Sequence, residues 1–83
     1  MTYHLGIAID IAEEWDRTPV EFRDGRTLVQ AAMQYPWSSR VRRCQEHGVE
    51  LLSEREWQEG VVDVLVVYLR GQQKEHEMLG RTA

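Results

Sequence analysis

The sequence lacks the features that mark secreted, membrane and disulfide-rich proteins. Its one cysteine, Cys44, cannot form an internal disulfide, which fits a reducing compartment. The longest apolar run covers residues 64–69, far short of the roughly 20 residues that a membrane-spanning helix needs. No basic segment followed by an apolar one marks the N-terminus as a secretory signal. We therefore expect a cytoplasmic location.

An excess of positive charge is also missing. The chain has 10 Lys and Arg residues against 14 Asp and Glu, for a net charge of −4, which argues against non-specific binding to nucleic acids or membranes. A length of 83 residues with 42% hydrophobic and 29% charged residues is typical of one small globular domain. We expect residues 1–83 to form that domain, with residues 71–83 as a frayed polar tail.

The chain has no CxxC or HExxH motif and no glycine-rich phosphate loop. Cys44 and His47 are one helical turn apart, but a metal site or a Cys–His nucleophile needs further groups that the sequence does not place nearby. Ser38 and Ser39 are better explained as helix caps than as nucleophiles. We predict a protein that is not an enzyme and that holds no cofactor and no metal.

Residues 3–11 alternate between apolar and small or polar side chains. The apolar ones occupy every odd position: Tyr3, Leu5, Ile7, Ile9 and Ile11. Strict alternation predicts a half-buried strand. As a helix the segment would put Leu5, Ala8, Ile9, Ala12 and Trp15 on one face. Because that face would leave Ile7 and Ile11 exposed, we favour the strand.

A second short strand is predicted after Pro19, where Val20 and Phe22 alternate with Glu21. The two strands would form a β-hairpin. A competing pattern is the capping box from Thr18 to Glu21, which would start a helix over residues 19–35. Asp24-Gly25 would then lie inside a helix, where this pair is unfavourable, so we prefer a turn there.

Two short helices are predicted next. Thr27 and Gln30 form a capping box ahead of a helix that Pro36 ends. A helix over residues 39–47 should end at Gly48, in the left-handed conformation. On it, Val41 and Cys44 would face inward, and Arg40, Arg43 and His47 would face outward.

The strongest helix prediction covers residues 54–70. Ser53 and Glu56 form a capping box, and an apolar face follows at Trp57, Val61, Val64, Leu65 and Tyr68. A strand over residues 61–69 is the alternative that the valines favour. It would bury the Asp63 carboxylate among apolar side chains, so the helix is preferred. The predicted fold class is α+β, an N-terminal hairpin packed on about three helices with helix 54–70 at the centre.

Helix 54–70 also has a second apolar stripe, formed by Val62, Val66 and Leu69. This stripe either completes the core or contacts a partner. Trp15 and Trp37, in predicted loops, are further candidates for an interface because tryptophan dominates many binding hot spots. We predict a protein–protein interaction function, by self-association as a homodimer or by docking on a larger protein.

The alternative function is a small nucleic-acid-binding regulator. Arg40, Arg42 and Arg43 form the main basic cluster, on the first of two helices joined by a turn. The second helix begins with Glu54 and Glu56, which would face phosphates unfavourably. Nucleic acid is therefore the less favoured partner.

Residues 53–69 resemble a pattern found in the small tail-assembly chaperones of long-tailed phages. In that pattern a capped helix opens with Ser, Arg-Glu and an aromatic residue and continues to a Tyr-Leu pair. The matching positions here are Ser53, Arg55, Glu56, Trp57, Tyr68 and Leu69. The resemblance implies a non-enzymatic phage accessory protein that holds another chain. By analogy, small acidic phage inhibitors of host proteins share the same size and charge.

Overall fold

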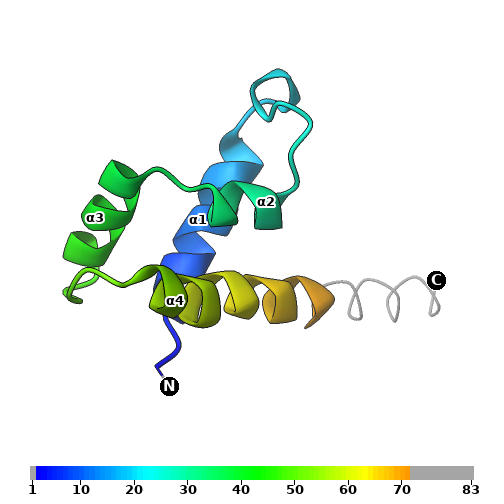
Figure 1. The fold of residues 1–83 in the computed structure, drawn as a ribbon. Helices are drawn as coiled ribbons and strands as arrows, with labels where there is room; N and C mark the ends of the chain where they lie inside the picture. The colour runs from blue at the N-terminus through cyan, green and yellow to red at the C-terminus, as the bar shows by residue number, and fades with distance from the viewer. Residues whose placement is uncertain (1, 72–83) are drawn as a thin grey trace.

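The computed structural model describes residues 2–71, and all secondary structure in this range is helical. The elements are α1 (Leu5–Arg17), a 3₁₀ turn (Val20–Phe22), α2 (Leu28–Met33), α3 (Trp37–Glu46), α4 (Glu54–Trp57) and a π-helical turn (Gln58–Val62). After the π-helical turn the chain is α-helical again from residue 63 to residue 71. We refer to residues 54–71 together as the long helix. In the view of Figure 1, α1 rises from the long helix, with α3 to the left of α1 and α2 to its right.

The predicted α+β class and its N-terminal β-hairpin are wrong, because residues 2–71 contain no strand. Residues 5–17 form α1, and its buried face consists of Ile7, Ala8, Ile11 and Ala12. These positions follow an i, i+1, i+4, i+5 pattern, which is one face of a helix. The helical alternative was rejected because it was drawn with Ile7 and Ile11 exposed, whereas the buried face of α1 includes both.

The second predicted strand is a single 3₁₀ turn, Val20–Phe22. Asp24 and Gly25 follow with φ angles of 52° and 69°, so the predicted turn is confirmed and the competing helix over residues 19–35 does not form. Arg23 folds back onto the end of α1, where it donates to the carbonyls of Thr18 and Trp15. The Trp15 carbonyl also accepts from the Thr18 amide, so Arg23 adds to the capping of the last turn of α1.

Two of the predicted helix caps are confirmed, at Thr27 and Ser53, whereas the cap expected at Ser38 or Ser39 is wrong: both serines lie inside α3, whose N-cap is Pro36 with no side-chain cap bond. The Thr27 hydroxyl accepts from the Gln30 amide, and the Gln30 side chain accepts from the Thr27 amide in return. Ser53 and Glu56 make the same reciprocal pair at the start of α4. The helix predicted over residues 54–70 is likewise confirmed. Gly48 has a φ of 66° just beyond α3, the left-handed conformation expected there.

The core gathers around Trp57. It contains Ile7, Ala8, Ile11, Ala12, Leu28, Ala32, Cys44, Leu52, Trp57, Val61, Val62 and Leu65. The Trp57 indole donates to the Ala32 carbonyl over 2.9 Å, and its ring stacks on Tyr35 with centroids 5.7 Å apart. One side chain therefore connects α4 to α2 and to the segment that follows α2.

The π-helical turn changes which face of the long helix is buried. In a regular α-helix, five residues would rotate Val62 about 140° from Trp57. The i→i+5 hydrogen bonding of a π-helical turn widens the turn by nearly one residue, so here Val62 is rotated back toward the side of Trp57. Both side chains are fully buried, and α1 and α2 both contact this turn. Val62 is therefore part of the chain's own core.

Candidate interaction surface

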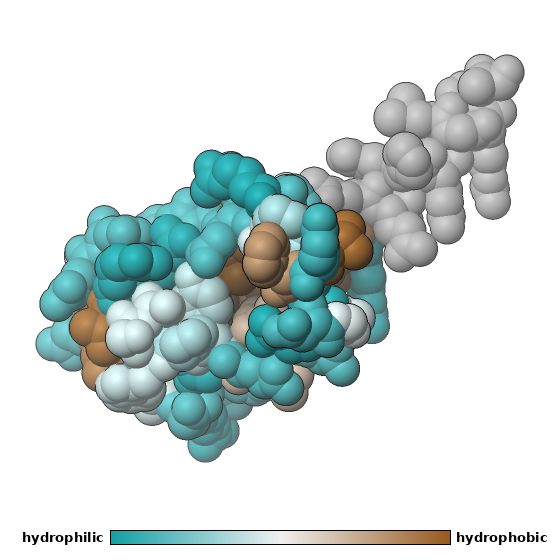
Figure 2. Space-filling model, turned by 90° about the horizontal axis from the view of Figure 1, so that it is seen from above, coloured by the Kyte–Doolittle hydropathy of each residue, from teal (hydrophilic) through white to brown (hydrophobic). Residues whose placement is uncertain are grey.

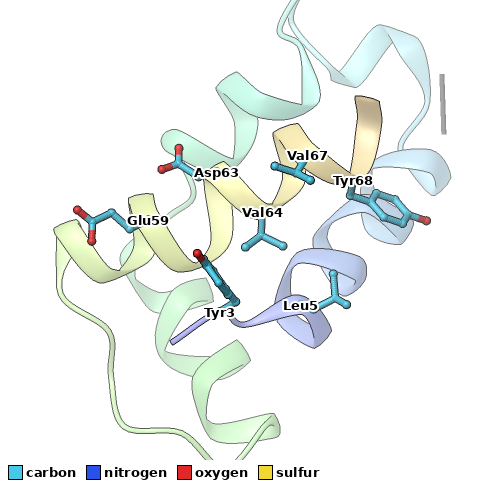
Figure 3. A pocket seen from close by; sticks show the side chains of 7 residues that line it. All are labelled: Tyr3, Leu5, Glu59, Asp63, Val64, Val67 and Tyr68. Carbon is cyan, nitrogen blue, oxygen red and sulfur yellow. The ribbon is translucent and has the colours of Figure 1, made fainter. Parts of the chain in front are cut away.

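An open apolar groove of about 560 Å³ lies between the N-terminal segment and the long helix. It is lined by Tyr3, Leu5, Glu59, Asp63, Val64, Val67 and Tyr68. Figure 3 shows the long helix supplying one side of the groove, with Tyr3 and Leu5 facing it from the start of the chain. The groove is thus formed by two segments that are more than 50 residues apart in the sequence.

The aliphatic and aromatic side chains of the groove are largely exposed. Tyr3 and Val67 are each 68% exposed, and Leu5 is 50% exposed. Val64 and Tyr68 are partly buried, since they also pack against the edge of the core. An isolated exposed apolar residue is ordinary, but several that share one concave surface are typical of a binding site.

A close backbone contact at Gly60 holds the N-terminal segment against the long helix. The His4 amide donates to the Gly60 carbonyl over 2.9 Å. A Cβ atom at position 60 would lie 2.9 Å from the Thr2 carbonyl oxygen and 3.0 Å from the His4 ring. Only glycine therefore allows the segment to approach this closely. The contact falls inside the π-helical turn, a distortion that is frequent at functional sites.

Two carboxylates give one end of the groove a negative charge. Glu59 and Asp63 lie on the long helix four residues apart, toward the end of the groove opposite Tyr68 (Figure 3). Glu59 accepts from the Arg55 guanidinium, which is mostly exposed, and Asp63 accepts from the neutral Gln58 amide. Among residues 2–71, the groove lining includes no lysine, arginine or histidine. The groove therefore combines an apolar floor with an acidic end.

A separate charged network joins α1 to α3. Arg43 of α3 donates to Glu14 of α1, and the Tyr35 hydroxyl donates to the same Glu14 oxygen over 2.7 Å. Burial raises the pKa of the Glu14 carboxyl, but the hydrogen bonds from Tyr35 and Arg43 outweigh it, so the pKa lies below its usual value. His47 and Asp10 make a further contact of 2.6 Å just beyond the C-terminal end of α3.

The pKa values of Tyr35 and Arg43, the other members of this network, are shifted in the direction expected of a structural ion pair. Burial raises the pKa of the Tyr35 phenol, and the neighbouring Glu14 carboxylate raises it further against the opposing effect of Arg43. The hydrogen bond with Tyr35 raises the pKa of the Arg43 guanidinium. A protonated phenol, an ionised carboxylate and a charged guanidinium satisfy one another, which fixes α1 against α3.

A smaller hollow of about 270 Å³ adjoins this network, with Glu14, Trp15, Phe22 and Tyr35 in its lining. Two of its lining residues already make structural contacts: Glu14 binds Arg43 and Tyr35, and the Trp15 carbonyl and ring both contact Arg23. We therefore consider the larger groove as the candidate interaction surface.

The predicted basic cluster is divided by the fold. Arg40 was expected to face outward, but it is almost fully buried. Its guanidinium donates to the carbonyls of Tyr35 and Met33 and to the Glu54 carboxylate. The carbonyls of Met33 and Tyr35 lie at or just beyond the end of α2, where they need a donor from outside the helix. The Arg40 side chain turns inward because it supplies that donor.

The remaining arginines of the cluster differ in exposure. Arg43 is largely buried in the network with Glu14, whereas Arg42 is mostly exposed and lies 4.0 Å from Glu46. Of the three candidates for phosphate contact, only Arg42 presents its charge freely to solvent. One exposed arginine is a poor basis for binding a phosphate backbone.

The predicted interface residues are not brought together on one surface. Val62 is in the core, and Val66 and Leu69 are partly buried along the long helix. Trp15 is partly buried under Arg23, whereas Trp37, at the start of α3, is exposed. None of these five lines the groove. The predicted frayed tail, apart from residue 71, lies outside the described residues.

Sequence reasoning missed the groove because it placed Tyr3 and Leu5 on a strand. The usable signal was Gly60, a helix-disfavouring residue inside a confidently predicted helix, which indicates a close backbone approach or a local distortion. Here it marks both. Val67 was also missed, because it belongs to neither predicted apolar stripe and becomes part of a groove only through the N-terminal segment beside it.

Cys44 and His47, the residues considered for metal binding or catalysis, both have structural roles. Cys44 is buried in the core, and His47 contacts Asp10. Across residues 2–71, no group of three or more His, Cys, Asp or Glu side chains is arranged to hold a metal ion. Within the same range, no helix combines the length and the apolar character needed to cross a membrane.

Figure 2 views the molecule from above the orientation of Figure 1. Most of this face is hydrophilic, and its apolar side chains are separated into small areas. The groove is the larger of the described hollows and is mainly apolar.

Comparisons with models of protein families, with curated proteins and with solved structures gave no match for this chain.

Proposed function

We propose that this chain is a non-enzymatic protein-interaction module that binds its partner in the groove between the N-terminal segment and the long helix. The observation that carries the proposal is the exposure of Tyr3, Leu5 and Val67 on one concave surface. The hydrophobic effect contributes about 25 cal/mol per Å² of apolar surface removed from water, so covering these side chains would favour association.

The structural roles of the reactive side chains support a function without catalysis. Cys44 is buried, and the Glu14–Tyr35–Arg43 network links two helices. A scaffold that fixes its polar groups internally and leaves apolar groups exposed is suited to binding. We place this activity in the cytoplasm, since a single buried thiol has no need of an oxidising compartment.

The test compares two valine substitutions of matched chemistry. Val67→Asp puts a charge in the groove, and Val20→Asp puts the same charge on the 3₁₀ turn, where the valine is 74% exposed and lines no part of the groove. Both sites are exposed, so the free energy of unfolding of both variants should lie within about 0.5 kcal/mol of the wild-type value. Each variant is used as bait for partners, and its mass in solution is measured at two concentrations.

The proposal is supported if the wild type and Val20→Asp retain the same partner and Val67→Asp loses it. Retention by Val67→Asp would contradict it. A partner lost only by Val20→Asp would move the interface to the 3₁₀ turn. A catalytic activity that depends on Glu14 or Cys44 would contradict the non-enzymatic part.

A further inference from the structure

We infer that the groove accepts a basic amphipathic helix, whose apolar face covers Leu5, Val64 and Val67 and whose Lys or Arg side chains lie against Glu59 and Asp63. This inference rests on the proposed function, because it names the class of partner for the same groove. Its independent support is the charge of the lining residues.

The shape of the groove favours a helix as the occupant. One wall is the long helix and the other is the start of α1 with the segment before it. A third helix can lie along such a depression and insert side chains from successive turns at i, i+3, i+4 and i+7. An added strand would need a sheet edge, and residues 2–71 contain no sheet.

The acidic end of the groove determines the sign of the partner. Asp63 is exposed, and its hydrogen bond comes from a neutral amide, so its charge is not compensated by that contact. Within residues 2–71, the salt bridge of Glu59 is made with Arg55, whose side chain is 84% exposed and screened by water. A glutamate or aspartate of the partner at this end would be repelled, and a lysine or arginine would be attracted.

The negative charge is also confined to one end of the groove, which fixes the direction in which the partner helix lies. Glu59 and Asp63 lie toward the start of the long helix, whereas Val67 and Tyr68 lie further along it (Figure 3). A helix whose basic residues precede or follow its apolar anchors can match this pattern in one direction only. The partner is therefore expected to carry its positive charge at one end of its apolar face.

The test uses two synthetic helical peptides of about 15 residues, or four turns. Both have the same leucine anchors on one face. One has lysines at one end of that face, and the other has glutamates at the same positions. Binding to the full chain is measured by fluorescence anisotropy at low and high salt, for the wild type, Val67→Asp, Val20→Asp and Asp63→Lys.

The lysine peptide should bind the wild type roughly tenfold more tightly than the glutamate peptide, and the difference should shrink at high salt. Asp63→Lys should remove or reverse the preference. Val67→Asp should weaken both peptides, and Val20→Asp should leave both unchanged. Tyr3→Ser, at a site 68% exposed, serves as a second groove variant.

Equal affinity for the two peptides, or a preference that survives Asp63→Lys, would overturn the inference. Failure of both peptides to bind would overturn it as well. If a cellular partner still depends on Val67 in that case, the groove is an interaction site for a different class of partner. A wild-type dimer that Val67→Asp converts to a folded monomer would identify a second copy of this chain as the occupant instead.

Discussion

The guanidinium of Arg40 lies over the indole ring of Trp57, with its carbon 5.0 Å from the ring centroid. The same guanidinium binds the carbonyls of Met33 and Tyr35 and the carboxylate of Glu54. A charged side chain therefore covers the central tryptophan and links the end of α2 to the start of α4. Each guanidinium nitrogen of Arg40 donates one of these hydrogen bonds, which compensates for the burial of the charge.

Arg40→Ala should lower the free energy of unfolding by about 2–4 kcal/mol, because it leaves two carbonyls without this donor and uncovers Trp57. Glu54→Gln should cost less than about 1 kcal/mol, because the Glu54 carboxylate is mostly exposed. Urea unfolding at neutral pH measures both. Equal losses in the two variants would mean that the ion pair, not the carbonyl bonds, is the important contact. Arg40→Lys should lose most of the same stability, since an ammonium lacks the planar fork.

The Glu14 carboxyl makes the stability of the fold depend on pH. Its pKa is lowered in the folded chain from an ordinary value of 4.5, so the ionised form stabilises the fold at neutral pH. That contribution is fully present above pH 4.5 and is lost as the pH falls through the lower pKa of the folded state. Glu14→Gln should remove it, at a cost of less than about 1 kcal/mol because the carboxylate is partly exposed.

The measurement is the free energy of unfolding between pH 7 and pH 3, for the wild type, Glu14→Gln and the control Glu13→Gln, whose side chain is exposed. Glu14→Gln should flatten the dependence, whereas Glu13→Gln should follow the wild type. An unchanged slope in Glu14→Gln would show that the network with Arg43 and Tyr35 does not form in solution.

Gly60→Ala should destabilise the protein although alanine is the better helix former. Helix propensity alone would give a gain of up to about 1 kcal/mol. The added Cβ would instead lie 2.9 Å from the Thr2 carbonyl, and the displacement should cost about 1–3 kcal/mol. At Gly71 no atom from another part of residues 2–71 lies within 4 Å of the position of a Cβ, so Gly71→Ala should be neutral or slightly stabilising.

Thermal unfolding compares the two glycine variants, and NMR amide shifts of residues 3–5 follow the N-terminal segment directly. The expected result is a lower midpoint and shifted resonances for Gly60→Ala only. A gain in stability at both positions would mean that the N-terminal segment is not docked at Gly60.

The parts of the fold governed by local chemistry could be predicted from the sequence. The capping boxes at Thr27 and Ser53 and the turn at Asp24-Gly25 depend on residues within four positions of one another, and the structure confirms all three. α1 was not predicted because its face depends on what packs against it. Ala8 is fully buried because other elements approach closely there, and one sequence alone does not record that approach.

The candidate site was beyond sequence reasoning for a related reason. The π-helical turn adds about one residue to a turn and rotates Val62 toward the core, where it is buried. Arg40 was assigned to the surface because arginine is mostly exposed in proteins. Its inward position depends on the carbonyls of Met33 and Tyr35, whose direction is set by the end of α2.

The bond between the His4 amide and the Gly60 carbonyl has a practical consequence for handling the protein. Tyr3 is adjacent to that bond, so one wall of the groove sits next to the beginning of the chain. A bulky affinity tag fused ahead of residue 2 would crowd this wall and compete with the proposed partner. Hydrogen–deuterium exchange at the His4 amide would detect such an effect, since the proton exchanges only when the segment lifts from the long helix.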